Sequence, residues 1–392
     1  MFIDYTPEEK RLQHELRAYL ANLITPEARA EWSGGGEGGG PLYRKTLRQM
    51  GADGWLGIGW PKEFGGQDRP PIEQYIFFDE VQRAGFPIPF LTLCTVGPTL
   101  MKYGTEEQRA KFLPAILRGE CHFAIGYSEP GAGTDLASLK TKAVRDGDHY
   151  VVNGQKMFTS LAEYSDYIWL AVRSDPEAQK HKGISILMVD TKSPGFSLTP
   201  IHTLGDNRTN ATYYDNVRVP VSMRVGREHE GWKLITNQLN HERVALLTPG
   251  PAAKIIEETT RWARETRLAD GRRVIDEPWV QTNLAKCVAR IEVLKLMTWR
   301  QAWNIQKDIL DPAESSTVKV FGSESFVQIY QWLQEILGQT GLIKEGSPGA
   351  FLAGRIERYY RTTLVLTFGG GVNEVQRDII AMAGLRMPRA AR

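Results

Sequence analysis

At residues 127–135 the chain reads Tyr-Ser-Glu-Pro-Gly-Ala-Gly-Thr-Asp. The proline fixes its own φ, and the two glycines permit backbone conformations and close approaches that a Cβ would forbid. Together these residues predict a polar loop whose backbone N–H groups can point outward at a ligand, as they do in anion-binding nests. A short glycine-rich loop can also be only a turn. The rest of the chain has to distinguish a binding loop from a turn.

The composition is typical of a globular protein with more than one domain. The chain has 392 residues, which is too long for one ordinary core. Apolar residues make up 42% and charged residues 24%, and a net charge of +2 gives no reason to expect nucleic acid or a membrane as a partner. The sequence contains no apolar run of membrane-spanning length and starts with no signal-peptide pattern. We therefore expect a cytoplasmic protein.

The cysteines give no sign of a disulfide framework or a metal site. Cys94, Cys121 and Cys287 are odd in number and widely spaced, with no Cys-x-x-Cys pair. This usage is typical of reduced thiols in an intracellular protein. We expect neither a disulfide nor a bound metal.

Helical patterns dominate the first part of the chain. Thr6-Pro7-Glu8-Glu9 combines an N-cap residue, a proline in the first turn and a glutamate at the capping-box position, so it predicts a helix start. Helical spacing of apolar residues continues, with interruptions, to about Gly119. An N-terminal helical domain over residues 1–120 follows from this pattern.

The period changes near Cys121. Asp146-Gly147 and Asn153-Gly154 are hairpin dipeptides flanked by β-prone runs, and residues 167–172, 183–189 and 217–220 predict further strands. After Gly231 the helical period returns. The fold class is therefore α+β, with a middle antiparallel β-domain over residues 121–226 and a C-terminal helical domain over residues 227–392.

The first helix after the β-domain carries a carboxylate on its apolar face. Five residues separated by 3, 4, 3 and 4 positions share that face: Trp232, Ile235, Leu239, Glu242 and Leu246. One interpretation is a buried ion pair of Glu242 with Arg243 or with a residue of another helix. The other is a general base, since desolvation raises the pKa of a carboxylate toward the range where it abstracts protons effectively.

The loop at residues 127–135 resembles the flavin-side signature of the acyl-CoA dehydrogenases, and the helical, β, helical order is similar to the order of domains in that family. The resemblance covers essentially the whole chain. It implies the acyl-CoA dehydrogenase fold with a C-terminal four-helix bundle, an FAD cofactor and an acyl-CoA substrate. In this family a carboxylate removes the α-proton while flavin N5 accepts hydride from the β-carbon. The product is a trans-2-enoyl-CoA, and the electrons pass to an electron transfer flavoprotein.

The resemblance also implies which carboxylate is the base. In many members the base lies near the C-terminus, and here that position falls at Gly370, which can transfer no proton. A minority, similar to isovaleryl-CoA dehydrogenase, carry the base just before an arginine on the helix after the β-domain. Glu242-Arg243 matches that position. Glu374 is a rival, but it lies four residues beyond the usual base position.

Further site residues follow from the resemblance. It places these residues at the flavin: Tyr127, Ser128, Gly133, Phe158, Thr159, Ser160, Asn373 and Glu374. Ser128 and the backbone around Tyr127 would face the pyrimidine edge, and Phe158 stands where a tryptophan usually covers the ring. Thr134 and Arg243 resemble positions that contact the acyl-CoA. Without the family, residues 156–160 are simply the end of a strand after an Asn-Gly hairpin.

Two departures from the family pattern concern the ADP half of FAD. In homotetrameric members a neighbouring subunit grips it through an Arg-x-x-Phe segment and a glutamine in Gln-x-x-Gly-Gly. Residues 268–276 lack the first, and residues 335–341 carry Glu335 where the glutamine is usual. A negative charge near a pyrophosphate is repulsive. We therefore expect a heteromer in which a related acyl-CoA dehydrogenase subunit supplies these contacts.

The segments at residues 240–243 and 369–377 are similar to those of heteromeric dehydrogenases that act on steroid side-chain CoA thioesters in sterol-degrading bacteria. This resemblance implies a bulky acyl group. Two alternatives stay open. One is a non-catalytic partner subunit, for which a glycine or serine at position 242 would have argued. The other is a flavin oxidase on the same fold, since a fold does not determine function.

Overall fold

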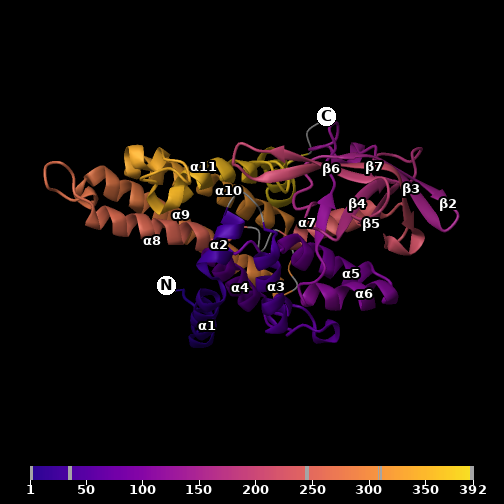
Figure 1. Ribbon diagram of the computed structural model, residues 1–392, viewed down its shortest axis with the longest axis horizontal. Coiled ribbons are helices and arrows are strands. Elements are labelled where there is room, and N and C mark those ends of the chain that lie inside the picture. The colour runs from indigo at the N-terminus through magenta and orange to yellow at the C-terminus, as the bar shows by residue number, and fades with distance from the viewer. Residues whose placement is uncertain (1–2, 34–37, 243–246, 308, 310, 389–392) are drawn as a thin grey trace.

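The computed structural model describes residues 3–33, 38–242, 247–307, 309 and 311–388. Figure 1 shows an elongated molecule with the β-sheet at one end, α8 and α9 at the other, and the N-terminal helices along one side. Among the described residues, none of the helices combines the length and apolar character that crossing a membrane requires.

The N-terminal part is helical, as the sequence predicts. Its capping box is present: Thr6 Oγ1 accepts a hydrogen bond from Glu9 N (3.2 Å), and Glu9 Oε2 accepts one from Thr6 N (2.8 Å). The helix that follows buries Leu12, Leu16 and Leu20. The helices of this part are α1 (Pro7–Leu23), α2 (Pro26–Ser33), α3 (Pro41–Ala52), α4 (Pro71–Ala84), α5 (Gly97–Tyr103) and α6 (Glu106–Leu117), with a π-helical turn at Thr92–Val96.

The described strands form one eight-stranded sheet in the order β6-β7-β3-β2-β4-β5-β8, with β1 paired to β4. Most pairs are antiparallel, as expected, whereas β1–β4 and the single β2–β4 pair are parallel. The strands are β1 (Phe123–Gly126), β2 (Lys142–Asp146), β3 (His149–Lys156), β4 (Tyr167–Arg173), β5 (Ile184–Asp190), β6 (Phe196–His202), β7 (Arg208–Pro220) and β8 (Arg224–Val225).

Of the two predicted hairpin dipeptides, one forms a turn and the other does not. Gly147, at φ +61°, turns the chain between β2 and β3, which confirms that hairpin. The hairpin predicted at Asn153-Gly154 is wrong, because this dipeptide lies inside β3 at an irregularity of the β3–β7 pairing. A Cβ on Gly154 would come within 2.6 Å of Thr141 Oγ1. The glycine therefore serves the close approach of two chain segments rather than a turn.

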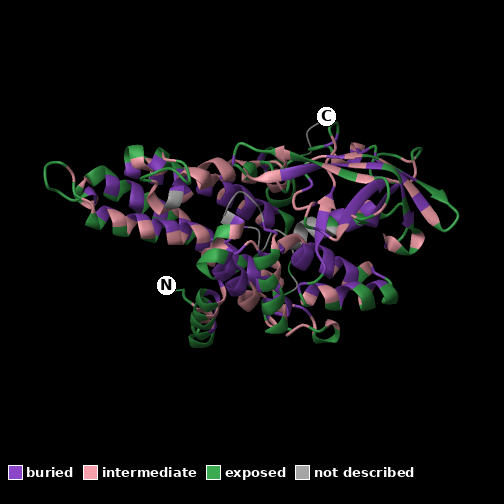
Figure 2. Cartoon of the chain, in the orientation of Figure 1, coloured by how far each residue is buried: buried purple, intermediate pink, exposed green. Residues whose placement is uncertain are grey.

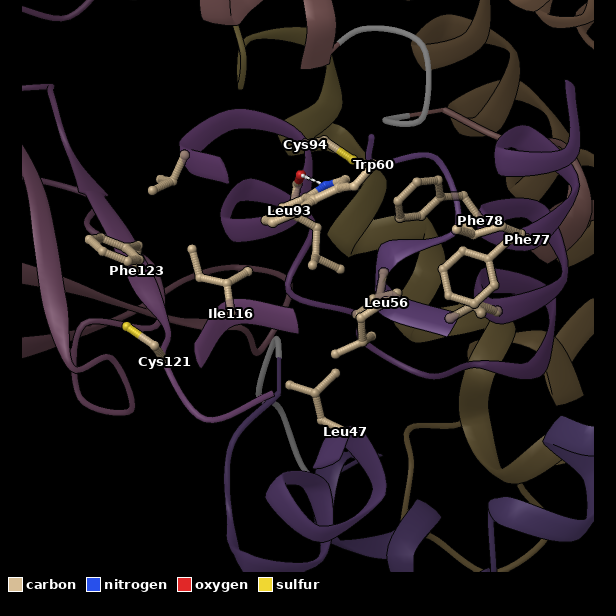
Figure 3. Close-up of a cluster of buried hydrophobic side chains, with 14 of the residues drawn as sticks. Leu47, Leu56, Trp60, Phe77, Phe78, Leu93, Cys94, Ile116, Cys121 and Phe123 are labelled. Carbon is tan, nitrogen blue, oxygen red and sulfur yellow. Dashed lines mark hydrogen bonds between the residues drawn. The ribbon is translucent and has the colours of Figure 1, made fainter. Parts of the chain in front are cut away.

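The strand β4 is buried on both faces and joins two cores. Trp169 and Ala171 face the N-terminal helices, in a cluster that also contains Met188 of β5. Ile168 and Leu170 face the opposite side of the sheet. Figure 2 shows buried residues on β4, β5 and the helices next to them, and Figure 3 shows part of the first cluster, where Trp60 Nε1 donates to Leu93 O (3.1 Å). The sheet and the N-terminal helices thus share a continuous core.

The C-terminal part contains a long helical hairpin. Its helices α9 and α10 bury Leu294, Ile329 and Leu333 against one another and against α8. Lys344 and Arg361 form ion pairs with Asp206 at the tip of the β6–β7 hairpin, so the bundle is fastened to the sheet. The helices are α7 (Gly231–Glu242), α8 (Gly250–Glu265), α9 (Pro278–Ile305), α10 (Pro312–Leu337), α11 (Arg355–Thr363) and α12 (Asn373–Ile379).

Candidate active site

The loop at residues 127–135 follows β1 and leaves open space beside its backbone. Glu129 and Ala132 exchange backbone hydrogen bonds of 2.9 and 3.1 Å, which makes a tight turn. Neither Gly131 nor Gly133 has a positive φ, so the backbone conformation does not require glycine there. A Cβ at either position would meet no other atom within 4 Å. The space beside the backbone at both glycines is therefore open.

A buried ion pair that the sequence reasoning missed holds this loop to the sheet. Lys156 Nζ, at the end of β3, lies 2.8 Å from Glu129 Oε1, and the lysine side chain is fully buried. Burial alone would raise the pKa of Glu129, but the positive charge of Lys156 and the hydrogen bonds to the carboxylate outweigh it and lower that pKa. Burial lowers the pKa of Lys156 to about 8 against the opposing charge of Glu129, so both groups are mostly charged at pH 7. No local signal identifies this pair, because its members are 27 residues apart in the chain.

The second segment predicted to face the flavin lies directly beside the first. Met157 N donates to Ser128 O (2.8 Å), and Lys156 Nζ donates to Tyr127 O (3.0 Å). Phe158 follows at φ +59°, a strained conformation for a phenylalanine, and its ring is exposed, with 62% of the residue accessible. Strained backbone positions of this kind cluster at active sites and ligand clamps.

The two hydroxyl residues after Phe158 are bonded to β7. Thr159 is fully buried, its N–H donates to Asn210 O (2.9 Å), and its hydroxyl lies 3.3 Å from that of Thr212. Ser160 Oγ donates to Thr209 Oγ1 (3.2 Å). These hydrogen bonds hold the backbone directly after Phe158 against β7. Gly133 and Thr134 are both exposed on the first loop.

The helix α7 leads from the β-domain to the predicted base. Leu234 and Ile235 are buried in the core shared with the N-terminal helices, and Trp232 packs against the same core. Trp232 and Ile235, the first two members of the predicted apolar face, are therefore partly and fully buried, whereas the side chain of Leu239 and the whole of Leu246 lie outside the described part of the structure. Glu242 is the last residue of α7, but its side chain lies outside the described part of the structure, as does the whole of Arg243.

The helix α8, which follows in the sequence, begins at a contact with α4. Gly250, the first residue of α8, donates its N–H to Asp79 Oδ1 of α4 (2.7 Å). A Cβ at position 250 would lie 2.6 Å from Asp79 O, so only glycine permits the contact. A cavity of 330 Å³ lies beside Asp79 between α1, α4, α8 and α9, and none of the predicted site residues lines it. Asp79 therefore anchors the start of α8 eight residues beyond Glu242.

Asp79 should make stability depend on pH. Its burial, together with the charge of Glu80, raises the pKa of its carboxyl to about 6. The folded protein therefore binds this proton more tightly than the unfolded chain, and the free energy of unfolding should fall as pH rises from about 4 to about 6. In the parent this free energy should fall by an amount on the order of 2 kcal/mol over this range. We expect Asp79→Asn, which keeps an acceptor for Gly250 N–H, not to show that fall. Urea titrations at several pH values measure the free energy of unfolding of both proteins. If that free energy depended equally on pH in the parent and the variant, Asp79 would not be the group responsible.

Asn373 and Glu374 lie in the C-terminal bundle. Asn373 is buried, and its described hydrogen-bond partners are Lys319, Ser323 and Glu324, all of α10. Its amide thus joins α12 to α10, while the neighbouring Glu374 is exposed. Lys319 Nζ also donates to Gly371 O (2.6 Å) and so fixes the glycine segment that the resemblance aligned with the usual base position. In that segment Gly370 and Gly371 have φ values of +67° and +102°, which favour glycine.

The segments at residues 268–276 and 335–341, which the sequence predicts to lack the family's contacts to the ADP half of FAD, have interaction partners within this chain. Arg272 pairs with Asp270 (2.7 Å) and Glu277 (2.6 Å), and Arg273 pairs with Asp276 (2.7 Å). Glu335 is exposed near the end of α10 and accepts a hydrogen bond from Asn283 Nδ2 (3.1 Å). These arginines are therefore already neutralised by carboxylates of their own loop.

Comparison with known proteins covers the whole chain. Models of the N-terminal, middle and C-terminal domains of acyl-CoA dehydrogenase match residues 6–120, 124–217 and 229–385. The acyl-CoA dehydrogenase FadE26 of Mycobacterium tuberculosis is 56% identical over 401 residues, and acyl-CoA dehydrogenase FadE29 of the same organism is 52% identical over 393; each match covers 100% of both chains.

Solved structures agree with these matches. A chain of the ChsE4-ChsE5 complex from M. tuberculosis has a TM-score of 0.94 and 56% identity, with 100% of both chains covered. A chain of the Tcur3481-Tcur3483 steroid ACAD has a TM-score of 0.94 and 51% identity, also with 100% of both chains covered. The chain therefore belongs to the acyl-CoA dehydrogenase family, whose members are oxidoreductases acting on CH–CH bonds.

Proposed function

We propose that this chain is the flavin- and base-carrying subunit of a heteromeric acyl-CoA dehydrogenase that converts a bulky steroid side-chain acyl-CoA into its trans-2-enoyl-CoA. FAD, when bound, supplies the acceptor for hydride from the β-carbon. The observation that carries the proposal is that two segments lie side by side, joined by the hydrogen bond from Met157 N to Ser128 O. One is the loop at residues 127–135, with open space beside Gly131 and Gly133, and the other carries the exposed ring of Phe158. Both features suit a large planar ligand.

The residues of this surface take distinct roles in the proposal. Phe158 covers one face of the ring system, and Ser128, with the backbone at Tyr127, faces its polar edge. Thr159 and Ser160 hold the Phe158 backbone in place through their bonds to β7. Gly133 leaves room for the cofactor, and Thr134 contacts the acyl-CoA together with Arg243. Asn373 and Glu374 contribute from the C-terminal bundle, Asn373 through the backbone it fixes.

Glu242 takes the α-proton in this proposal. The support is its position in the sequence, seven residues after the buried Ile235 and therefore on the same helical face. A carboxylate on a buried face has its pKa raised by desolvation. The position that carries the base in many relatives is Gly370, whose side chain is a hydrogen atom. A related subunit completes the site on the ADP side, since Arg272 and Arg273 are paired within their own loop. The similar ChsE4-ChsE5 complex and Tcur3481-Tcur3483 steroid ACAD each combine two different named proteins.

Purification alone and with a partner tests the proposal. We expect the isolated chain to bind FAD poorly or to be insoluble. The same chain co-expressed with the product of its neighbouring gene should retain FAD, and a steroid side-chain CoA thioester should bleach that flavin under anaerobic conditions. Electrons should then pass to an electron transfer flavoprotein.

Other outcomes of this experiment would overturn parts of the proposal. A stable, fully flavinylated homotetramer would remove the heteromer. A flavin-loaded assembly that no acyl-CoA bleaches would point to a non-catalytic subunit. Rapid reoxidation of the reduced flavin by O₂ would point to an oxidase.

A further inference from the structure

We propose that Glu129 and Lys156 are positioning residues for the flavin site: their buried ion pair locks the loop at residues 127–135 onto the end of β3 and so fixes the surface that Phe158 presents. This inference rests on the proposed function, because it assumes that the surface receives the flavin. Neither residue has its charged group exposed toward a ligand, so both act through the backbone segments that they hold.

Lys156 joins the loop to the strand. Its side chain is fully buried, and its Nζ donates to Glu129 Oε1 (2.8 Å) and to Tyr127 O (3.0 Å). The next residue, Met157, donates its N–H to Ser128 O (2.8 Å). Two consecutive residues of the second segment are therefore bonded to the first three residues of the loop.

Glu129 joins the loop to a third segment. Its carboxylate accepts hydrogen bonds from Lys140 N (2.7 Å, to Oε2) and from Thr141 N (2.8 Å, to Oε1), just before β2. Only 7% of its side chain is exposed. The absence of a Cβ at Gly154 brings Thr141 against β3, which closes the arrangement. One ion pair thus sits where three stretches of chain meet.

The strained backbone at Phe158 indicates the role of the ion pair between Glu129 and Lys156. A phenylalanine at φ +59° persists only where the surrounding structure over-determines it. The ion pair lies two residues before Phe158, and the bonds of Thr159 and Ser160 to β7 lie directly after it. A buried ion pair adds little net stability over an apolar pair of similar volume, because desolvation offsets the attraction between the charges. Its specific effect here is geometric.

Three variants test the inference in the assembly that co-purifies with its partner: Glu129→Gln, Lys156→Met and the double variant. Each single change leaves a buried group without its partner and should lower the melting temperature. The double variant leaves no unpaired charge and should recover much of that loss. All three should weaken FAD binding by roughly 10- to 100-fold, the loss that removal of outer-shell partners causes at metal sites. Flavin fluorescence measures the dissociation constant.

A matched control is Asp146→Asn. It breaks the ion pair between Asp146 and Arg218 in the same sheet, where both side chains are more than half exposed (62% and 53%), and it should change neither property. A double variant that binds FAD as tightly as the parent would overturn the inference, because the pair would then be merely structural.

Amide hydrogen exchange separates this inference from the proposed function. If the parent assembly holds no FAD, the proposed function fails. Faster exchange at the amides of Lys140, Thr141 and Met157 in the double variant than in the parent would still show that the pair fixes the loop. Unchanged exchange at these amides would overturn the inference whether or not flavin is bound.

Discussion

Glu242→Gln will slow the anaerobic bleaching of the flavin by acyl-CoA on the order of 10²–10⁴-fold or more. Glutamine keeps the size and polarity of the side chain but cannot accept the α-proton. The change should appear in the rate of the chemical step rather than in the affinity for the acyl-CoA, because the carboxylate begins to accept the proton only in the transition state. Stopped-flow absorbance of the flavin-loaded heteromer measures this rate directly.

Glu374→Gln tests the rival candidate for the base. Glu374 is exposed on the first turn of α12 and contributes to the flavin site in our proposal, so its replacement should weaken FAD binding, whereas the FAD-saturated heteromer should still bleach at close to the parent rate. Bleaching at the parent rate in Glu242→Gln would show that Glu242 is not the base. If only the Glu374 variant lost bleaching, the role would pass to that residue.

Trp169→Ala will lower the free energy of unfolding by about 3–5 kcal/mol. The side chain is fully buried in β4 and packs edge-on against Phe123 in the core shared with the N-terminal helices. Its removal leaves a large cavity where the sheet meets those helices. Equilibrium unfolding in urea, followed by tryptophan fluorescence and by circular dichroism, measures the effect.

Two further variants calibrate this result. Trp169→Phe keeps an aromatic ring and removes an indole N–H that has no described hydrogen-bond partner, so it should cost much less than the alanine change. Val144→Ala, at a position that is 59% exposed on β2, should be nearly neutral. A loss below about 1 kcal/mol for Trp169→Ala would mean that the two layers do not depend on their shared core.

Local signals in the sequence predicted much of the fold. The capping box at Thr6 and the Asp146-Gly147 turn are short-range features, and the structure contains both. Asn153-Gly154 has the same local chemistry as a hairpin turn, yet it lies within β3 because Thr141 approaches Gly154 from another part of the chain. That contact is long-range, and no dipeptide preference reports it.

The candidate site likewise contains features that the sequence predicted and features that it did not. The composition of residues 127–135 predicted the loop, and the resemblance added Phe158 as its neighbour. The ion pair between Glu129 and Lys156 could not be predicted, because it depends on the register of β3 against a loop 27 residues earlier. For Asn373 the resemblance implied a role at the flavin, and the structure adds that its buried amide is bonded to α10, a contact that no local signal reports.

The two-sided burial of β4 limits how far this protein can be treated as separable modules. Trp169 and Ala171 complete the interior of the N-terminal helices, while Ile168 and Leu170 complete that of the sheet. A fragment cut between these layers would expose a broad apolar face to water and would aggregate. Chimeras between relatives therefore have to transfer the N-terminal helices and the sheet as one unit, since either layer alone lacks half of its interior.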